Sequence, residues 1–168
     1  MQSICAVEGV SAGGIREGKY GLALIRASGA AVAVFTRNQV RAAPVELMME
    51  RMRRGRLEAI VANSGCANCY TGRRGYADAV RMCEIAGGVL GVDPEGVGVA
   101  STGVIGRYLD MPLIERQASA VGPRLARSGA AEELAAAAIM TTDTCQKHAL
   151  VRKEGFSVGG IAKGSGMI

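Results

Sequence analysis

The stretch LEAIVANSGCANCYTGRRGYADAVRMCEIAGGVLG, residues 57–91, contains the pattern that decides the fold. Its first seven residues, 57–63, form a short apolar run that is typical of a buried strand. Small and polar residues rich in Gly and Asn follow, and they predict a loop up to residue 75. From Tyr76 to Gly91 the apolar residues recur at helical spacing and predict a helix. A strand, a loop and a helix in this order indicate an α/β protein.

The helix predicted over 76–91 has one apolar face. Four small or apolar side chains are spaced to lie on it: Ala79, Val80, Cys83 and Ala86. Because such a face packs against a sheet, we expect Cys83 to be a small core residue.

The same unit is repeated toward the C-terminus. Residues 95–101 predict a second strand, and the polar segment after them leads to a helix that begins at Met111. Asp110 is suited to cap this helix, and Pro112 to its first turn. An Ala-rich stretch over 130–140 predicts a further helix.

Both ends of the chain have a different pattern, which predicts hairpins. Residues 21–38 form two apolar runs around a Ser-Gly turn, and residues 148–153 and 156–163 predict two strands joined by a short turn. Between the first hairpin and the strand at residue 57, residues 43–55 predict a helix. Its first turn contains Pro44, and its apolar face contains Val45, Met48, Met49 and Met52.

Length and composition fit one α/β domain over residues 1–168, in which a mixed sheet is packed with helices. Of the 168 residues, 49% are hydrophobic. No apolar run approaches the roughly 18 residues that cross a membrane, and the N-terminus lacks the features of a secretory signal. We therefore expect a cytoplasmic protein with no membrane partner.

The net charge of +5 is mild. The one dense basic run, ERMRRGR over residues 50–56, falls at the end of a predicted helix, where cations suit the helix dipole. With two Phe, four Tyr and no Trp, few side chains are present for base stacking. Nucleic acid is therefore not an expected partner.

Five cysteines, an odd number, indicate a reducing compartment rather than a disulfide framework. Cys66 and Cys69 form a C-x-x-C pair, but a zinc site needs about four ligands, and the chain has no second pair and one histidine. We expect no metal and no cofactor. A catalytic pair would have to use His148, and no nucleophile motif points to a partner for it.

Three polar loops and the C-terminal KGSG remain. The loops are ANSGCAN (62–68), ASTGVIG (100–106) and MTTDT (140–144). Small hydroxyl residues beside Gly expose backbone N–H groups, which can serve as an oxyanion hole or an anion site. Each loop alone is an ordinary turn, and it is their order along the chain that is distinctive.

Read together, five stretches of the chain resemble the N-terminal, or alpha, half of the ornithine acetyltransferases, also called glutamate N-acetyltransferases. They occur in the family's order and cover almost the whole chain. The stretches are VFTRNQVRAAPV (34–45), ANSGCANCYTG (62–72), STGVIGRYLDM (101–111), IMTTDT (139–144) and GGIAKGSGMI (159–168).

The resemblance implies the self-processing ornithine acetyltransferase-like fold and a chain that is one product of a cleaved precursor. The precursor would continue past Ile168 to an Ala-Thr bond that it cleaves itself, and the new N-terminal threonine of the beta chain would be the nucleophile. Its own α-amine can act as the base. The implied reaction transfers an acetyl group from N2-acetyl-L-ornithine to L-glutamate by ping-pong kinetics, without a metal or cofactor.

By motif match, the resemblance assigns roles to five residues. Thr102 and Gly103 would form the oxyanion hole. Thr141, Lys163 and, with weaker support, Thr142 would bind substrate. Whether Lys163 pairs with the substrate carboxylate or steers the leaving amine stays open.

The chain departs from the family pattern in one loop. GCANC (65–69) stands where N-A-N-A-C is expected, so that Cys66 replaces a polar residue. If that polar side chain braces the oxyanion loop in the family, its role is in question here. The replacement also creates the C-x-x-C pair, which supports an incidental origin for it.

The implied partner is the beta chain of the same precursor, in an alpha2-beta2 assembly or larger. The use of acetyl-CoA as a second donor stays open. Two other hypotheses are a self-processing N-terminal-nucleophile aminopeptidase and a non-enzymatic module that binds an amino acid.

Overall fold

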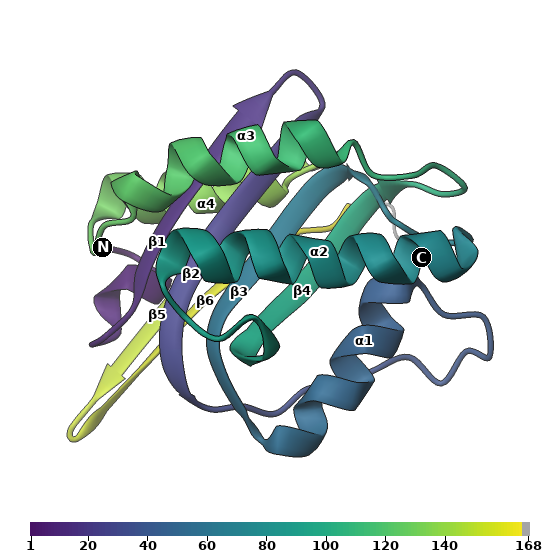
Figure 1. Cartoon of the computed structure of the whole chain (residues 1–168). Helices are drawn as coiled ribbons and strands as arrows, with labels where there is room; N and C mark the ends of the chain where they lie inside the picture. The colour runs from purple at the N-terminus through teal and green to yellow at the C-terminus, as the bar shows by residue number, and fades with distance from the viewer. Residues whose placement is uncertain (166–168) are drawn as a thin grey trace.

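A four-stranded sheet with the strand order β1-β2-β3-β4 forms the centre of the computed structural model, which describes residues 1–165 (Figure 1). The first three strands are antiparallel neighbours, and β4 runs parallel to β3. The sheet is therefore mixed, as predicted. Its strands are β1 (Ser11–Glu17), β2 (Tyr20–Ala30), β3 (Arg56–Cys66) and β4 (Val97–Val104).

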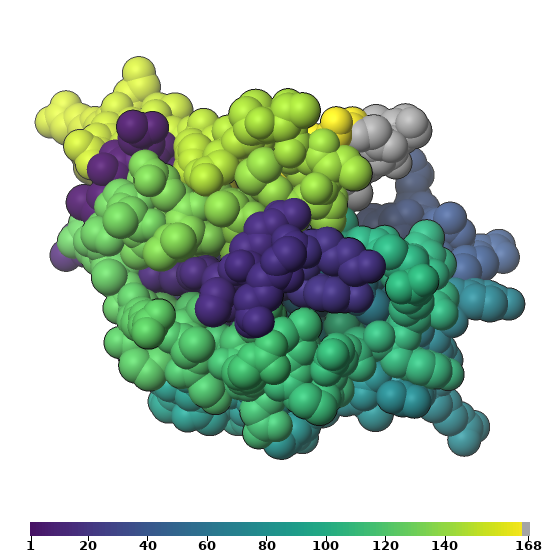
Figure 2. All heavy atoms as spheres, turned by 90° about the horizontal axis from the view of Figure 1, so that it is seen from above, coloured from purple at the N-terminus to yellow at the C-terminus, as the bar shows by residue number. Residues whose placement is uncertain are grey.

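Helices cover the two faces of the sheet unequally. On the face toward the viewer in Figure 1 lie α2 (Gly72–Leu90) and α3 (Met111–Val121), with α1 (Ala43–Arg51) against α2 and β4. On the other face α4 (Gly129–Ile139) packs mainly on β1 and β2. Figure 2 shows α3 and α4 on opposite sides of the β1–β2 turn. Among residues 1–165, no helix is long and apolar enough to cross a membrane.

A separate hairpin of β5 (Lys147–Lys153) and β6 (Phe156–Ala162) lies on the α4 side. Its strand β6 packs against the short 3-10 helix η1 (Ile4–Ala6). This hairpin confirms the prediction for the C-terminal end of the chain. Three further 3-10 turns connect the larger elements: η2 (Met52–Arg54), η3 (Pro94–Gly96) and η4 (Gly122–Arg124).

The larger part of the core lies between the sheet and α2 with α3, and a smaller cluster lies between the sheet and α4. Alternate residues of β3 are buried toward α2 and α3, while Ile60 on the opposite face is 37% exposed. The face predicted for α2 is confirmed except at Val80, which is only partly buried; Ala79, Cys83 and Ala86 are fully buried. Burial raises the pKa of the Cys83 thiol to about 11, so that it is inert as a nucleophile.

Two helix ends follow the predicted signals, whereas α2 begins at Gly72, four residues before the predicted start at Tyr76. In α1 the proline is in the first turn, and Gly55, with a φ of 63°, ends the η2 turn that follows. The methionine face predicted for α1 is only half-buried, because Leu47 takes the core position. At α3 the carboxylate of Asp110 accepts a hydrogen bond of 3.1 Å from the Leu113 N–H, which confirms the predicted cap.

The hairpin predicted over residues 21–38 is wrong. Strand β2 continues through the Ser-Gly pair with a register shift between Arg26 and Gly29, and its antiparallel partner is β1. The residues after β2 form no strand, and Val32 and Val34 are 99% and 100% exposed. Strand β1 was not predicted, because glycines weaken the pattern of apolar residues that indicates a strand.

The N-terminus is tied to α4 by a buried carboxylate. Glu132 is 1% exposed, and its oxygens accept hydrogen bonds from the N–H groups of Gln2, Ser3 (3.2 Å) and Cys5 (3.0 Å). Burial acts to raise the pKa of Glu132, but these N–H groups outweigh it, and the pKa is lowered. The ionised carboxylate therefore stabilises the fold.

Replacing Glu132 by Gln is expected to lower the free energy of unfolding by about 2–3 kcal/mol at pH 7, because hydrogen bonds to a charged group are lost. A lowered pKa means that the contribution is present above the unfolded value of about 4.3 and is lost as pH falls through the folded value. The difference from wild type should thus shrink below pH 4. Urea unfolding of the full-length protein at pH 7 and below pH 4 measures this difference in the free energy of unfolding.

Glu133 is the matched control, because it is the next residue of the same helix and is exposed. Its replacement by Gln should change stability by less than about 0.5 kcal/mol. If both variants lowered the free energy of unfolding equally, the hydrogen bonds between Glu132 and the N-terminus would make no specific contribution to stability.

Candidate functional site

Thr102 and Gly103 lie at the carboxyl end of β4, beside the end of β3. The parallel register pairs Ser64 with Thr102 and Gly65 with Gly103, and it shifts at Cys66. Thr102 is partly exposed and Gly103 is exposed. The shift interrupts regular pairing at this edge, as is common next to active sites.

Two glycine backbones meet at this point. A Cβ on Gly103, whose φ is +145°, would lie 2.2 Å from the carbonyl carbon of Gly65 and 2.4 Å from the Cys66 nitrogen. Gly65, with a φ of +99°, is in turn packed against the ring of Tyr20. The peptide of Gly103 is thus held in one position by backbone atoms.

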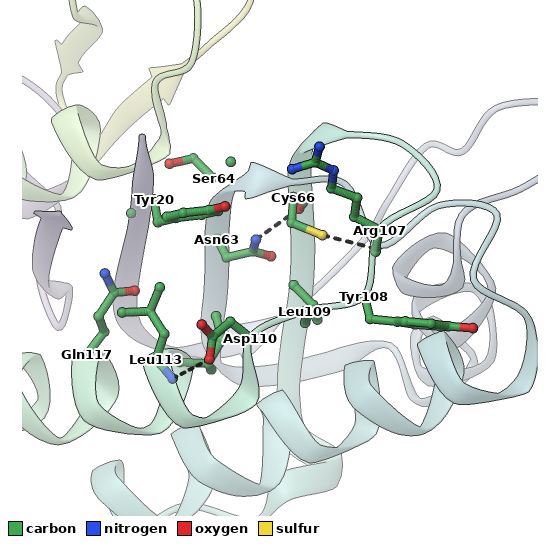
Figure 3. Close-up of a pocket in the computed structure, with 13 residues that line it drawn as sticks. Tyr20, Asn63, Ser64, Cys66, Arg107, Tyr108, Leu109, Asp110, Leu113 and Gln117 are labelled. Carbon is green, nitrogen blue, oxygen red and sulfur yellow. Dashed lines mark hydrogen bonds between the residues drawn. The ribbon is translucent and has the colours of Figure 1, made fainter. Parts of the chain in front are cut away.

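The Cys66 thiol braces this region. It donates a hydrogen bond of 3.3 Å to the carbonyl of Arg107, while the Asn63 amide donates one of 2.9 Å to the carbonyl of Cys66 (Figure 3). The Ala67 N–H also donates to the carbonyl of Val104 at 3.0 Å. The loop after β3 is therefore tied to the loop after β4, and the cysteine at position 66 takes part in this.

A small pocket of about 50 Å³ lies between the strand ends and α3, and Figure 3 shows the residues that line it. Neither Thr102 nor Gly103 lines it. Two buried carbonyl oxygens that line it, Asn63 Oδ1 and Gln117 Oε1, have no hydrogen-bond partner within the described part of the chain. The pocket thus adjoins the oxyanion candidates without including them.

The loop that contains Thr141 is joined through Asp143 to Gly164, the residue that follows Lys163. The Oδ1 of Asp143 accepts hydrogen bonds from the Gly164 N–H at 2.6 Å and from the Lys147 ammonium at 2.5 Å. Its Oδ2 accepts one of 3.3 Å from the Thr141 N–H. The Lys147 hydrogen bond first, and the Gly164 N–H next, hold the pKa of Asp143 well below its usual range.

The TTDT loop also begins beside the oxyanion candidates. The Ser64 hydroxyl, one strand away from Thr102, donates to the carbonyl of Ala138 at 2.6 Å. Arg16 caps the end of α4 by donating to the carbonyl of Met140 at 2.5 Å. The helix that leads into Thr141 is therefore anchored at the same end of the sheet as Thr102.

The remaining predicted residues are less constrained. Thr142 is exposed in the same loop, and within residues 1–165 no hydrogen bond joins it to the other candidates. The last three residues of the KGSGMI motif lie outside the described residues. The sequence did not indicate a role for Asp143, Lys147 or Arg16. Of the three, only Asp143 lies within a motif, TTDT.

The histidine and the cysteines form no cluster of metal ligands in the described part of the chain. His148 contacts the Ser3 hydroxyl at 3.2 Å and the Gln146 side chain at 2.9 Å, which links β5 to the N-terminus. No group of three or more His, Cys, Asp or Glu residues among residues 1–165 is placed to hold a metal ion. All five cysteines are unpaired.

The structure thus combines a mixed α/β domain with a Thr-Gly pair at the end of β4 and, anchored at the same end of the sheet, the loop that contains Thr141. The chain belongs to the ArgJ family, whose profile matches residues 6–168.

Individual relatives and a solved structure support membership of this family. The glutamate N-acetyltransferase of Methanosarcina mazei is 52% identical over 167 residues, which are 98% of this chain and 42% of that protein. The arginine biosynthesis bifunctional protein of Archaeoglobus fulgidus is 47% identical over 98% of this chain and 43% of its own length. The chain thus spans less than half the length of these relatives.

The crystal structure of ornithine acetyltransferase complexed with ornithine from Mycobacterium tuberculosis is 36% identical to this chain. It matches with a TM-score of 0.95 over 99% of this chain and 94% of the other. The likeness confirms the predicted fold.

Proposed function

We propose that the chain is the alpha subunit of an N-terminal-threonine acetyltransferase that moves the acetyl group of N2-acetyl-L-ornithine to L-glutamate. The observation that carries the proposal is the convergence of two motifs in an ArgJ-family chain. The Thr102–Gly103 strand end and the loop that contains Thr141 are anchored at the same end of the sheet, and Asp143 joins that loop to the segment after Lys163.

The proposed reaction has two halves. The N-terminal threonine of the beta chain attacks the acetyl carbonyl, the amide C–N bond breaks, and ornithine leaves with the proton. The amine of glutamate then attacks the acetyl ester and releases the threonine. In both halves Thr102 and Gly103 stabilise the negative oxygen of the tetrahedral intermediate, and Thr141, Lys163 and Thr142 hold the substrate.

Lys163 is expected to contribute to substrate binding more than to stability. Replacement by Ala should raise KM for acetylornithine about 10- to 100-fold and leave the unfolding midpoint nearly unchanged, because a charge-assisted hydrogen bond to substrate is lost. Steady-state kinetics and thermal unfolding measure the two effects. Lys153→Ala, at an exposed site in the β5–β6 hairpin, is the control.

The same variant addresses the role of Lys163. If Lys163 pairs with the substrate carboxylate, its replacement by Ala should not further raise KM for an acetylornithine whose carboxylate is amidated. A variant that unfolds without a change in KM for the folded fraction would make the lysine structural.

The proposed partner is a beta chain from the same precursor, in an alpha2-beta2 assembly or larger. Two observations support it. The chain spans 42% of the length of the Methanosarcina mazei relative, and it exposes large apolar side chains, among them Val32, Val34, Tyr70 and Ile105. Apolar surface of this kind is typical of a site that another chain covers. The five unpaired cysteines support a reducing, cytoplasmic location.

Denaturing intact-mass measurement of the protein expressed from the complete gene tests the proposal. Two masses are expected, one of them a chain that begins with threonine, together with ping-pong transfer from acetylornithine to glutamate. Peptide hydrolysis without transfer would favour the aminopeptidase. A single mass with no turnover would leave the amino-acid-binding module. An assay with acetyl-CoA decides whether it is a second donor.

A further inference from the structure

Asp143 closes the open end of the β5–β6 hairpin. The last paired residues are Lys147 on β5 and Ala162 on β6. Asp143 lies four residues before this pair and Gly164 two residues after it, and the carboxylate of Asp143 accepts the Gly164 N–H at 2.6 Å. The side chain thus extends the hairpin beyond its last backbone pair.

Both backbone groups of Gly164 are held in this arrangement. Its N–H donates to Asp143, and its carbonyl accepts a hydrogen bond of 2.8 Å from the Lys147 ammonium. The same ammonium contacts the Asp143 carboxylate at 2.5 Å. Lys163 therefore stands between Ala162, which is paired in the sheet, and Gly164, which is fixed by two side chains.

The other oxygen of the carboxylate faces the other loop. It accepts the Thr141 N–H at 3.3 Å, so that one side chain contacts both segments that carry substrate-binding candidates. The Asp143 side chain is 0% exposed while that of Lys147 is 43% exposed. An ordinary surface ion pair leaves both partners in water and adds little, whereas here a buried carboxylate makes two hydrogen bonds to backbone.

We propose that Asp143 is a positioning residue that holds Thr141 and Lys163 in one fixed arrangement for substrate binding, with Lys147 as its support. The proposal rests on the proposed function of those two residues. Asp143 itself contacts no substrate, and it acts by fixing the backbone on both sides of the site. Small displacements of binding groups are costly to catalysis, up to about 100-fold for a displacement of about 1 Å.

The test uses the full-length, processed enzyme with Asp143→Asn and Lys147→Met. We expect kcat/KM for acetylornithine to fall about 10- to 50-fold in Asp143→Asn, mainly through KM. The loss in Lys147→Met should be smaller, because the carboxylate and its two N–H partners remain. The pH profile should keep its shape in both variants, since a positioning group transfers no proton.

Asp93 offers a matched control at the opposite end of β4. Its carboxylate also accepts a backbone N–H, that of Glu95 at 3.0 Å, and also contacts a cation, Arg54 at 3.7 Å. Asp93→Asn should leave kcat and KM within about twofold of wild type. An equal loss of kcat/KM in Asp93→Asn and Asp143→Asn would overturn the proposal.

Amide hydrogen exchange gives a second readout that does not depend on activity. In the Asp143→Asn enzyme, the amides of residues 141–146 and 159–165 should exchange faster, together, while the rest of the chain is unchanged. If wild type transfers no acetyl group, the proposed function fails, and this exchange result still decides whether Asp143 joins the two segments.

Unchanged exchange in both segments, or kcat/KM within twofold of wild type in a folded Asp143→Asn enzyme, would overturn the role. Loss of a limb of the pH profile would overturn it too, since Asp143 would then transfer a proton. Should Asp143→Asn fail to fold, Lys147→Met carries the same test. A raised KM together with faster exchange in both segments would support the role, and the absence of both effects would refute it.

Discussion

Replacing Thr102 by Ala is expected to slow both self-cleavage and acetyl transfer about 100- to 1,000-fold. The hydroxyl of Thr102 is proposed to donate to the oxygen that becomes negative in the tetrahedral intermediate, and both reactions pass through such an intermediate. The fold should be unaffected, because Thr102 is only partly buried at a strand end. Intact-mass time courses measure cleavage, and single-turnover acetylation measures transfer.

Thr102→Ser is the control for this experiment, because it keeps the hydroxyl and removes a methyl group. It should retain cleavage and transfer within about tenfold of wild type. If Thr102→Ala turned over at the wild-type rate, the hydroxyl would have no part in the site, and the backbone of Gly103 would be the remaining donor.

Replacing Gly103 by Ala is expected to have a larger effect. The new Cβ would lie 2.2 Å from the carbonyl carbon of Gly65, and a φ of +145° is one that side-chain-bearing residues rarely adopt. Strained backbone alone costs about 1–3 kcal/mol. The strands must also separate to relieve the contact, so that processing and transfer should both be abolished and the free energy of unfolding lowered by about 3 kcal/mol or more.

Gly155→Ala separates the two causes. Gly155 also has a positive φ, +82°, but nothing lies within 4 Å of a Cβ there. Its replacement should cost about 1 kcal/mol and leave activity intact. Urea unfolding and the mass assay compare the two variants, and a Gly103→Ala enzyme that is processed normally would contradict the close packing of β3 and β4.

The central elements were predictable from the sequence because their signals are local. The apolar run of β3, the cap at Asp110 and the periodicity of α2 each depend on neighbouring residues. Strand β1 was not predictable, because its Gly13–Gly14 pair carries no strand signal. The reason for glycine is tertiary: a Cβ on Gly14 would lie 2.4 Å from the carbonyl oxygen of Leu134.

The valines after β2 mislead for the opposite reason. Val32 and Val34 have the alternation of a strand, yet they contact nothing that would bury them in the chain described here. Apolar alternation predicts a strand only where a sheet is present to receive it. A surface that another chain covers shows the same apolar alternation, and a single sequence does not distinguish such a surface from a buried strand.

The candidate site was predictable in part. Resemblance assigned roles to Thr102, Gly103, Thr141 and Lys163, but physical reasoning from composition and spacing indicated only that these loops expose backbone donors. The role of Asp143 depends on a contact across 21 residues, with Gly164. Nothing in the spacing of TTDT and KGSG predicts that contact.

The meeting of Gly65 and Gly103 has a consequence for how such chains can diverge. The atoms that a Cβ on Gly103 would strike belong to the backbone of Gly65 and Cys66, which every amino acid carries. No second substitution nearby can therefore make room for a side chain. The requirement for glycine at position 103 thus depends on the path of the β3 backbone and not on which side chain stands at position 65.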